Sequence, residues 1–136
     1  MAGDPTAHSS KKVLIVEDNQ LNLKLLKDLL EYHGYQVLTT GLGEAVLDMA
    51  RRHKPDLILM DIQLPDITGT EAARRLKADE HTRSIPIVAV TAFAMSEDRA
   101  KVLASGCDEY VAKPISVIEF LQLVERYTNQ SVPQRG

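Results

Sequence analysis

"LILMDIQLPDITG", from Leu57 to Gly69, places four apolar residues directly before an aspartate and a loop that contains a proline. A short continuous apolar run that ends at turn-forming residues is typical of a strand buried on both faces of a sheet. A carboxylate at the end of such a strand is costly to bury unless it is paired, hydrogen-bonded or bound to a metal. Asp61 is therefore expected to have a structural partner or a chemical role.

The alternation of apolar strands with helices continues on both sides of this segment. The expected strands lie at residues 11–16, 35–40, 56–60, 85–92 and 108–113. The expected helices lie at residues 20–33, 43–53, 68–79, 96–105 and 116–128. Apolar strands that alternate with helices indicate a parallel sheet covered on both faces. The pattern predicts a doubly wound α/β sandwich, one domain at residues 11–128, with a disordered tail at 1–10 and a flexible tail at 129–136.

Several residues mark the ends of the expected helices. Asn19 caps the first helix, and Ser116 with Glu119 has the spacing of a capping box at the start of the last one. Gly34 is expected just past the end of the first helix. Asn22 is expected to make a hydrogen bond at the entry of this helix. Its apolar face is expected to consist of Leu21, Leu25, Leu26, Leu29 and Leu30.

The composition of the chain excludes several classes of function. A net charge of -3 and an isoelectric point near 5.8 provide no basic surface for nucleic acid. No apolar run approaches the roughly 20 residues of a membrane span, and the first residues lack the regions of a signal peptide. The single cysteine allows no intrachain disulfide, and the histidines are too scattered for a zinc site. We therefore expect a cytoplasmic protein that is not inserted in a membrane.

Charged and polar groups follow four of the expected strands. Glu17 and Asp18 follow the first strand, and Asp61 follows the third. Thr91 lies at the end of the fourth strand and Lys113 at the end of the fifth. In doubly wound sheets, ligands bind beyond the carboxyl ends of the strands, where the strand order reverses. These five residues are therefore the candidates for a functional site.

The chemistry of this set favours phosphoryl transfer. Three clustered carboxylates repel each other unless a cation compensates them, and hard oxygen ligands of this number suit Mg²⁺. Lys113 cannot bind the metal, but its ammonium can pair with Asp61 at rest and with a phosphoryl oxygen later. The Thr91 hydroxyl can donate a hydrogen bond to the same group. These properties make Asp61 the expected nucleophile, because phosphoryl transfer depends mainly on positioning and charge neutralisation.

The four motifs at the strand ends resemble those of one family. "VLIVEDNQ" (13–20), "LILMDIQLPDITG" (57–69), "IPIVAVTA" (85–92) and "YVAKP" (110–114) together are similar to the receiver domain of two-component response regulators, the CheY-like superfamily. Within this family the chain most resembles a single-domain cell-cycle regulator. The resemblance implies a flavodoxin-like sheet of five parallel strands in the order 2-1-3-4-5 with five helices.

The same resemblance assigns roles at the metal and phosphoryl site. Asp61 would accept a phosphoryl group from a phosphohistidine of a histidine kinase or a phosphotransfer protein. Asp18, Asp61 and the backbone carbonyl of Gln63 would bind Mg²⁺, and Glu17 would act through a metal-bound water. Thr91 and Lys113 would contact the phosphoryl oxygens.

Four further positions receive roles from the resemblance. Tyr110 would be an aromatic switch that turns inward as Thr91 moves toward the phosphoryl group. The side chains at positions 63 and 93, here Gln63 and Phe93, would tune hydrolysis of the acyl phosphate. Ala92 is small enough to leave room for the phosphoryl group, and Pro114 follows the lysine, with a cis bond expected before it. Two purely structural interpretations remain as alternatives: Thr91 as an ordinary strand residue and Tyr110 as an aromatic residue of the core.

The resemblance also implies two protein-binding surfaces. Because only eight, mostly polar residues follow the last expected helix, we expect the signal to leave through a protein surface. The implied output face comprises residues 95–104, 108–112 and 117–127. Kinase docking would use residues 20–24 and 114–115.

Three other functions remain to be compared with this one. A flavodoxin is excluded because its phosphate-binding loop would carry two carboxylates in "EDNQ". An aspartyl-phosphate phosphatase would need an acid two residues after Asp61, where Gln63 lies. A receiver-like scaffold that acts by binding alone stays open as an alternative.

Apart from self-catalysed phosphoryl acceptance and slow autodephosphorylation, no enzyme activity is expected. Asp66, beyond the loop proline, is expected to be solvated.

Overall fold

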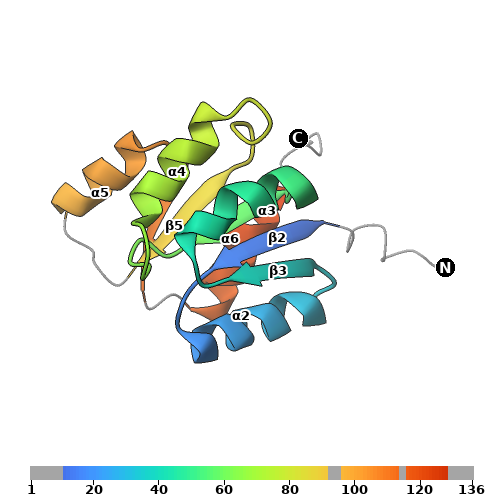
Figure 1. Ribbon diagram of the computed structural model, residues 1–136. Coiled ribbons are helices and arrows are strands. Elements are labelled where there is room, and N and C mark those ends of the chain that lie inside the picture. Colours follow the sequence, from blue (N-terminus) through green and yellow to red (C-terminus); the bar gives the residue numbers. More distant parts are fainter. Residues whose placement is uncertain (1–10, 92–95, 114–115, 129–136) are drawn as a thin grey trace, which may run out of the picture.

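The protein is a five-stranded parallel sheet between two layers of helices (Figure 1). The computed structural model describes residues 11–91, 96–113 and 116–128. The strands are β2 (Lys12–Val16), β3 (Gln36–Thr40), β4 (Leu57–Met60), β5 (Ile87–Thr91) and β6 (Glu109–Ala112). The helices are α2 (Gln20–Tyr32), the 3₁₀ helix η1 (Gly43–Ala45), α3 (Val46–His53), α4 (Gly69–Ala78), α5 (Ser96–Ala104) and α6 (Val117–Thr128).

The strand order is β3-β2-β4-β5-β6, and every neighbouring pair is parallel. The predicted order 2-1-3-4-5 and the doubly wound fold are therefore confirmed. Val16 of β2 is in register with Met60 of β4. The residues that follow these two strands therefore emerge side by side, and the Asp61 amide donates to the Val16 carbonyl at 2.9 Å.

Two separate cores hold the helices on the sheet. On one face, α3, α4 and α5 pack against side chains such as Leu14, Ile58 and Ile87. On the other face, α2 and α6 pack against the alternate side chains of the same strands, such as Val13 and Leu57. Because both faces are covered, β2, β4 and β5 are apolar on each side, as expected for central strands of a parallel sheet.

Local hydrogen bonds fix the ends of several helices. The Asn19 side chain accepts from the Asn22 backbone N–H at 3.0 Å, so Asn22 makes its helix-entry bond with the backbone. The Ser116 hydroxyl accepts from the Glu119 N–H at 3.1 Å, as the capping-box spacing predicts. Gly34 follows α2 with a φ of 93°, a backbone conformation that favours glycine.

The prediction for the apolar face of α2 is wrong for two leucines. Leu30 is fully buried and Leu26 is half-buried, but Leu21 is 70% and Leu25 59% exposed. At 3.6 residues per turn, Leu21 lies about half a rotation away from Leu30. The buried stripe instead passes through Leu23, Leu26 and Leu30, with three- and four-residue spacing.

Some predictions fall outside the described part of the chain. The expected tails at 1–10 and 129–136 lie there, so the division into tails and domain stays a prediction. Ala92, Phe93 and Pro114 also lie outside the described residues. Among the helices that are described, none is long and apolar enough to cross a bilayer.

The two environments on α2 yield a prediction for stability. Replacing Leu30, which is fully buried, with alanine should lower the free energy of unfolding by about 2–5 kcal/mol through lost apolar contact and a residual cavity. The matched control, Leu25→Ala on the exposed side of the same helix, should change it by less than about 0.5 kcal/mol. Urea unfolding followed by circular dichroism measures both; equal losses would contradict the assignment of the two faces.

Candidate functional site

Three carboxylates meet at the carboxyl ends of β2 and β4. One carboxylate oxygen from each of Glu17, Asp18 and Asp61 lies within 4.8 Å of the others. Glu17 and Asp61 are 4% and 9% exposed, whereas Asp18 is exposed. The carboxylates border a hollow of about 420 Å³. It is lined by Glu17, Asp18, Asn19, Asn22, Asp61, Gln63, Leu64, Pro65 and Lys113.

Lys113 bridges the two buried carboxylates. Its Nζ lies 2.9 Å from Glu17 Oε1 and 3.3 Å from Asp61 Oδ2. The backbone N–H of Lys113 donates to the Thr91 carbonyl at 2.8 Å, which ties the end of β6 to the end of β5. Burial lowers the pKa of Lys113, but the hydrogen bond that Lys113 donates to Glu17 and the charges of Glu17 and Asp61 outweigh this effect and raise the pKa overall. The predicted pair with Asp61 is present, but the bond to Glu17 is shorter.

The three carboxylates differ in the bonds that they already make. Glu17 uses both oxygens, because Oε2 also accepts from the Asn19 N–H at 3.1 Å. Asp61 accepts from the Gln63 N–H at 3.0 Å through Oδ1 and from Lys113 through Oδ2. Within the described residues, Asp18 takes part in no hydrogen bond or ion pair. Asp18 is thus the carboxylate most available to an added ligand.

The donor set fits a hard divalent cation. The atoms that could bind a metal here are carboxylate oxygens. Three carboxylates lie near the single ammonium of Lys113, so the group has a net charge of two negative charges. Mg²⁺ prefers oxygen ligands and commonly binds through one or two carboxylates while it keeps several waters. Asp18 and Asp61 can bind it directly. Glu17 is the least exposed of the three and has the shorter bond to Lys113, so it suits a contact through water.

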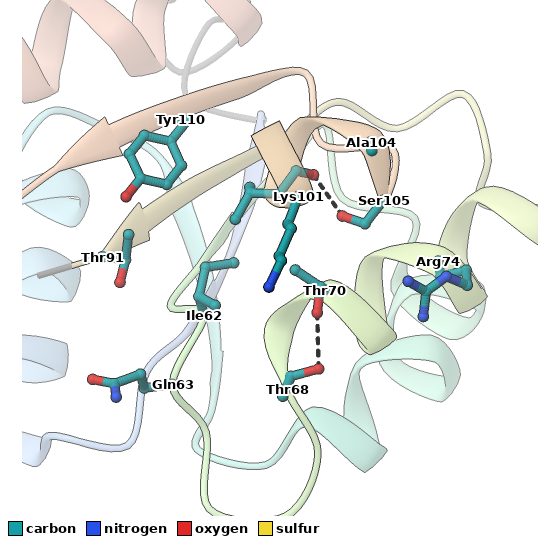
Figure 2. A pocket seen from close by; sticks show the side chains of 11 residues that line it. Ile62, Gln63, Thr68, Thr70, Arg74, Thr91, Lys101, Ala104, Ser105 and Tyr110 are labelled. Carbon is teal, nitrogen blue, oxygen red and sulfur yellow. Dashed lines mark hydrogen bonds between the residues drawn. The ribbon is translucent and has the colours of Figure 1, made fainter. Parts of the chain in front are cut away.

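Thr91 and Tyr110 line a second hollow of about 470 Å³ (Figure 2). Thr91 ends β5 and is 1% exposed, and Tyr110 of β6 is 7% exposed. Figure 2 shows the Tyr110 ring above Thr91, with Gln63 and Ile62 below. The hollow is lined by Ile62, Gln63, Thr68, Thr70, Arg74, Thr91, Lys101, Val102, Ala104, Ser105 and Tyr110.

The second hollow connects the loop after Asp61 with helix α5. Gln63 lines both hollows, so the acidic hollow and the second hollow are adjacent at this residue. The Arg99 guanidinium of α5 lies 5.8 Å from the centre of the Tyr110 ring, within cation–π range. Burial of Tyr110 suits both a core aromatic and an inward-turned switch. Its switch role therefore stays a prediction.

Sequence analysis missed two residues at or near the site. Asn22 lines the acidic hollow from the first turn of α2. Its position only four residues after Asp18 could have indicated that it lies near the carboxylates. Asp66 is exposed, as expected, but its contact with a neighbouring helix was not predicted. Its carboxylate accepts from the backbone N–H groups of Gly43 and Glu44, each at 2.8 Å. No local pattern predicts a contact between segments so far apart in the chain.

Comparison with known proteins identifies relatives over nearly the whole chain. The response regulator receiver domain family matches residues 13–125. Polar-differentiation response regulator DivK of Brucella ovis is 52% identical over 118 residues, which cover 87% of this chain and 96% of that protein. DivK of Brucella anthropi is 51% identical over 117 residues, or 86% of this chain and 95% of that protein.

Solved structures agree with these sequence matches. The receiver domain of sensor histidine kinase PA1611 from Pseudomonas aeruginosa is 35% identical, with a TM-score of 0.82 over 88% of this chain and 98% of that one. It was crystallised with a magnesium ion coordinated in the active site cleft. The co-crystal structure of the Saccharomyces cerevisiae phosphotransfer protein Ypd1 with the Ssk1 receiver domain contains a chain that is 28% identical, with a TM-score of 0.84 over 93% of this chain and 94% of that one.

The chain belongs to the response regulator receiver family. The family match and the identity to DivK confirm the resemblance expected from the motifs at the strand ends.

The bridging position of Lys113 yields a prediction that depends on pH. Lys113→Met should lower the free energy of unfolding by about 1–3 kcal/mol near pH 7, because the carboxylates of Glu17 and Asp61 lose their cation. The pKa of Lys113 in the folded protein is raised above its ordinary value of 10.5. The contribution of charged Lys113 to the free energy of unfolding is therefore fully present below pH 10.5. It is lost as the pH rises through the pKa of Lys113 in the folded protein.

Urea unfolding of wild type and variant from neutral to alkaline pH measures this difference. It should stay constant near neutrality and shrink above pH 10.5. Lys24→Met is the control, because Lys24 pairs with Asp28 at 2.8 Å with both side chains more than half exposed, so its loss should change little. A difference that grows in alkaline solution would contradict the prediction.

Proposed function

We propose that this receiver-family protein accepts a phosphoryl group on Asp61 from a phosphohistidine of a sensor kinase or phosphotransfer protein. The observation that carries the proposal is the position of Asp61 at a strand end, hydrogen-bonded to Lys113 and beside Glu17 and Asp18. The identity to DivK supports a place in a phosphorelay of the cytoplasm that controls the bacterial cell cycle, cell division or cell fate.

The proposed step is an in-line displacement at phosphorus. A carboxylate oxygen of Asp61 forms the new P–O bond while the P–N bond to the donor histidine breaks, and the bonding electrons leave with the imidazole. Lys113 neutralises charge on the phosphoryl oxygens, and the Thr91 hydroxyl donates a hydrogen bond to one of them. Asp18, Asp61 and the Gln63 carbonyl would hold Mg²⁺, with Glu17 acting through water. When bound, the ion neutralises charge on the phosphoryl group.

The proposed output is a shift between two conformations. Phosphorylation would replace the single negative charge of the Asp61 carboxylate with the roughly two charges of a bulkier phosphoryl group near buried Thr91, and Tyr110 borders the same hollow as Thr91. Movement of these two side chains would alter α5, β6 and α6, which we propose as the face for a downstream protein target. The residues expected to tune hydrolysis, Gln63 and Phe93, would set the lifetime of this state.

The proposed docking surface for the phosphoryl donor includes the start of α2. Leu21 and Leu25 are apolar and exposed there, next to the acidic hollow that Asn22 lines. The Ypd1–Ssk1 complex shows that a similar receiver chain binds a phosphotransfer protein. The other expected docking segment, at 114–115, lies outside the described residues.

The alternative is a scaffold that signals by binding alone. For the phosphoryl acceptor, the proposed chemistry is limited to self-catalysed phosphoryl acceptance and slow autodephosphorylation. The scaffold would carry out neither reaction, so we propose no enzyme with other substrates in either case. Phosphorylation of the isolated protein distinguishes the two functions.

Phosphorylation by a small acyl phosphate is the direct test. Wild type incubated with the donor and Mg²⁺ should gain one phosphoryl group in its intact mass, and omission of Mg²⁺ should abolish the gain. Asp61→Asn should gain none, because an amide is a far weaker nucleophile. Asp28→Asn, an exposed aspartate on α2, is the matched control and should behave like wild type. A wild type that gains no mass from this donor or from a phosphorylated phosphotransfer protein would favour the scaffold.

The switch role of Tyr110 can be separated from phosphorylation. Tyr110→Ala should still be phosphorylated on Asp61, because Tyr110 is not among the residues that line the acidic hollow. It should lose the phosphorylation-dependent change in hydrogen exchange at α5 and β6, measured by mass spectrometry. Tyr110→Phe keeps the ring and controls for loss of core volume. Equal loss of labelling and of the exchange response would refute the separate role.

A further inference from the structure

Asp66 fastens the loop that follows Asp61 to a neighbouring helix. Its Oδ1 accepts from the Gly43 N–H and its Oδ2 from the Glu44 N–H, each at 2.8 Å. These amides belong to the first residues of η1, which runs directly into α3. A carboxylate there satisfies donors that a helix start leaves free. The hydrogen bond from Glu44, followed by that from Gly43, lowers the pKa of Asp66, so the clamp is ionised at neutral pH.

Packing around Gly43 reinforces the same contact. A Cβ atom at Gly43 would lie 2.6 Å from Ile67 Cγ1 and 3.2 Å from Leu64 Cδ1. The residues on both sides of Asp66 therefore pack closely on η1. The absence of a side chain at Gly43 is what permits this approach.

The inner end of the loop is closed by separate bonds. The Gly69 N–H donates to the Ile62 carbonyl at 2.8 Å, and the Gln63 N–H donates to Asp61 Oδ1 at 3.0 Å. The loop thus forms one compact turn that is closed at its base and clamped by Asp66 at its outer end. Gln63, whose carbonyl is the proposed third metal ligand, lies between these two fixed points.

We infer that Asp66 is a positioning residue, which holds the Gln63 carbonyl and the Asp61 carboxylate in the arrangement that binds Mg²⁺. The inference rests on the proposed function. Without the clamp, the outer part of the loop can take more conformations, and binding must then supply the free energy that orders it. Outer contacts that orient metal ligands commonly change metal affinity by about 10–100-fold.

Mg²⁺ affinity of the unphosphorylated protein, measured by calorimetry, is the test. Asp66→Asn keeps the shape of the side chain but replaces one acceptor oxygen with an NH₂ group that faces a backbone N–H. We expect its Mg²⁺ dissociation constant to rise about 10-fold. Asp66→Glu, which retains both acceptor oxygens, should recover much of the affinity.

Glu44→Gln is the matched control for charge. It removes the same charge from the neighbouring segment, but the Glu44 side chain pairs with Arg75 at 2.9 Å instead of the loop, and its backbone N–H remains available to Asp66. A dissociation constant for Asp66→Asn equal to that of Glu44→Gln would overturn the inference, since the effect would then be one of net charge. Urea unfolding without metal separates this effect from stability: a stability loss with unchanged Mg²⁺ affinity would also overturn it.

The outcome for wild type distinguishes failure of the inference from failure of the proposed function. If wild type binds Mg²⁺ and is phosphorylated on Asp61, equal affinities in wild type and Asp66→Asn refute only the role of Asp66. If wild type binds no Mg²⁺ and gains no phosphoryl group, the proposed function is refuted and the positioning role with it.

Discussion

The bridge from Lys113 to Glu17 and Asp61 is the interaction on which the rest of the site depends. The parallel strands β2 and β4 end side by side, and this places two nearly buried carboxylates next to each other. Burial costs each ion several kcal/mol and repulsion adds to it, so the pair requires a cation. Lys113 comes from the end of β6, two strands away from β4, and reaches both carboxylates. The site is therefore assembled only when three strand ends are correctly placed.

The three carboxylates make different hydrogen bonds, and these differences suggest different roles. Glu17 is fully engaged by Lys113 and the Asn19 amide and acts as the anchor of the lysine. Asp18 is exposed and available to a cation. Asp61 has the longer bond to Lys113, so the proposed phosphoryl group would compete with the weaker of the two contacts. Three negative charges and one positive charge leave a deficit that one divalent cation would balance, which links metal binding to the charge arrangement that the fold imposes.

Sequence was most informative where a residue's environment follows from its strand or helix. The apolar runs predicted the strands, and their ends gave the carboxylates, Thr91 and Lys113, because parallel strands end at one edge. Sequence failed where geometry depends on distant segments. The exposed positions of Leu21 and Leu25 depend on how α2 is rotated against the sheet, and leucine spacing left that rotation ambiguous. The contact of Asp66 with η1 joins residues more than 20 positions apart, and no periodic pattern encodes it.

The loop that follows Asp61 has different surroundings on its two sides, and for the proposed phosphoryl group this difference would favour one direction of structural change. On one side the loop packs closely against η1, where not even a Cβ atom at Gly43 would fit without displacement. On the other side Ile62 and Gln63 border the hollow that also contains Thr91 and Tyr110 (Figure 2). Close-packed contacts resist displacement, whereas side chains beside a hollow can change their arrangement at lower cost. The proposed phosphoryl group on Asp61 would therefore be accommodated toward β5, Tyr110 and α5, which is the side that carries the proposed output face.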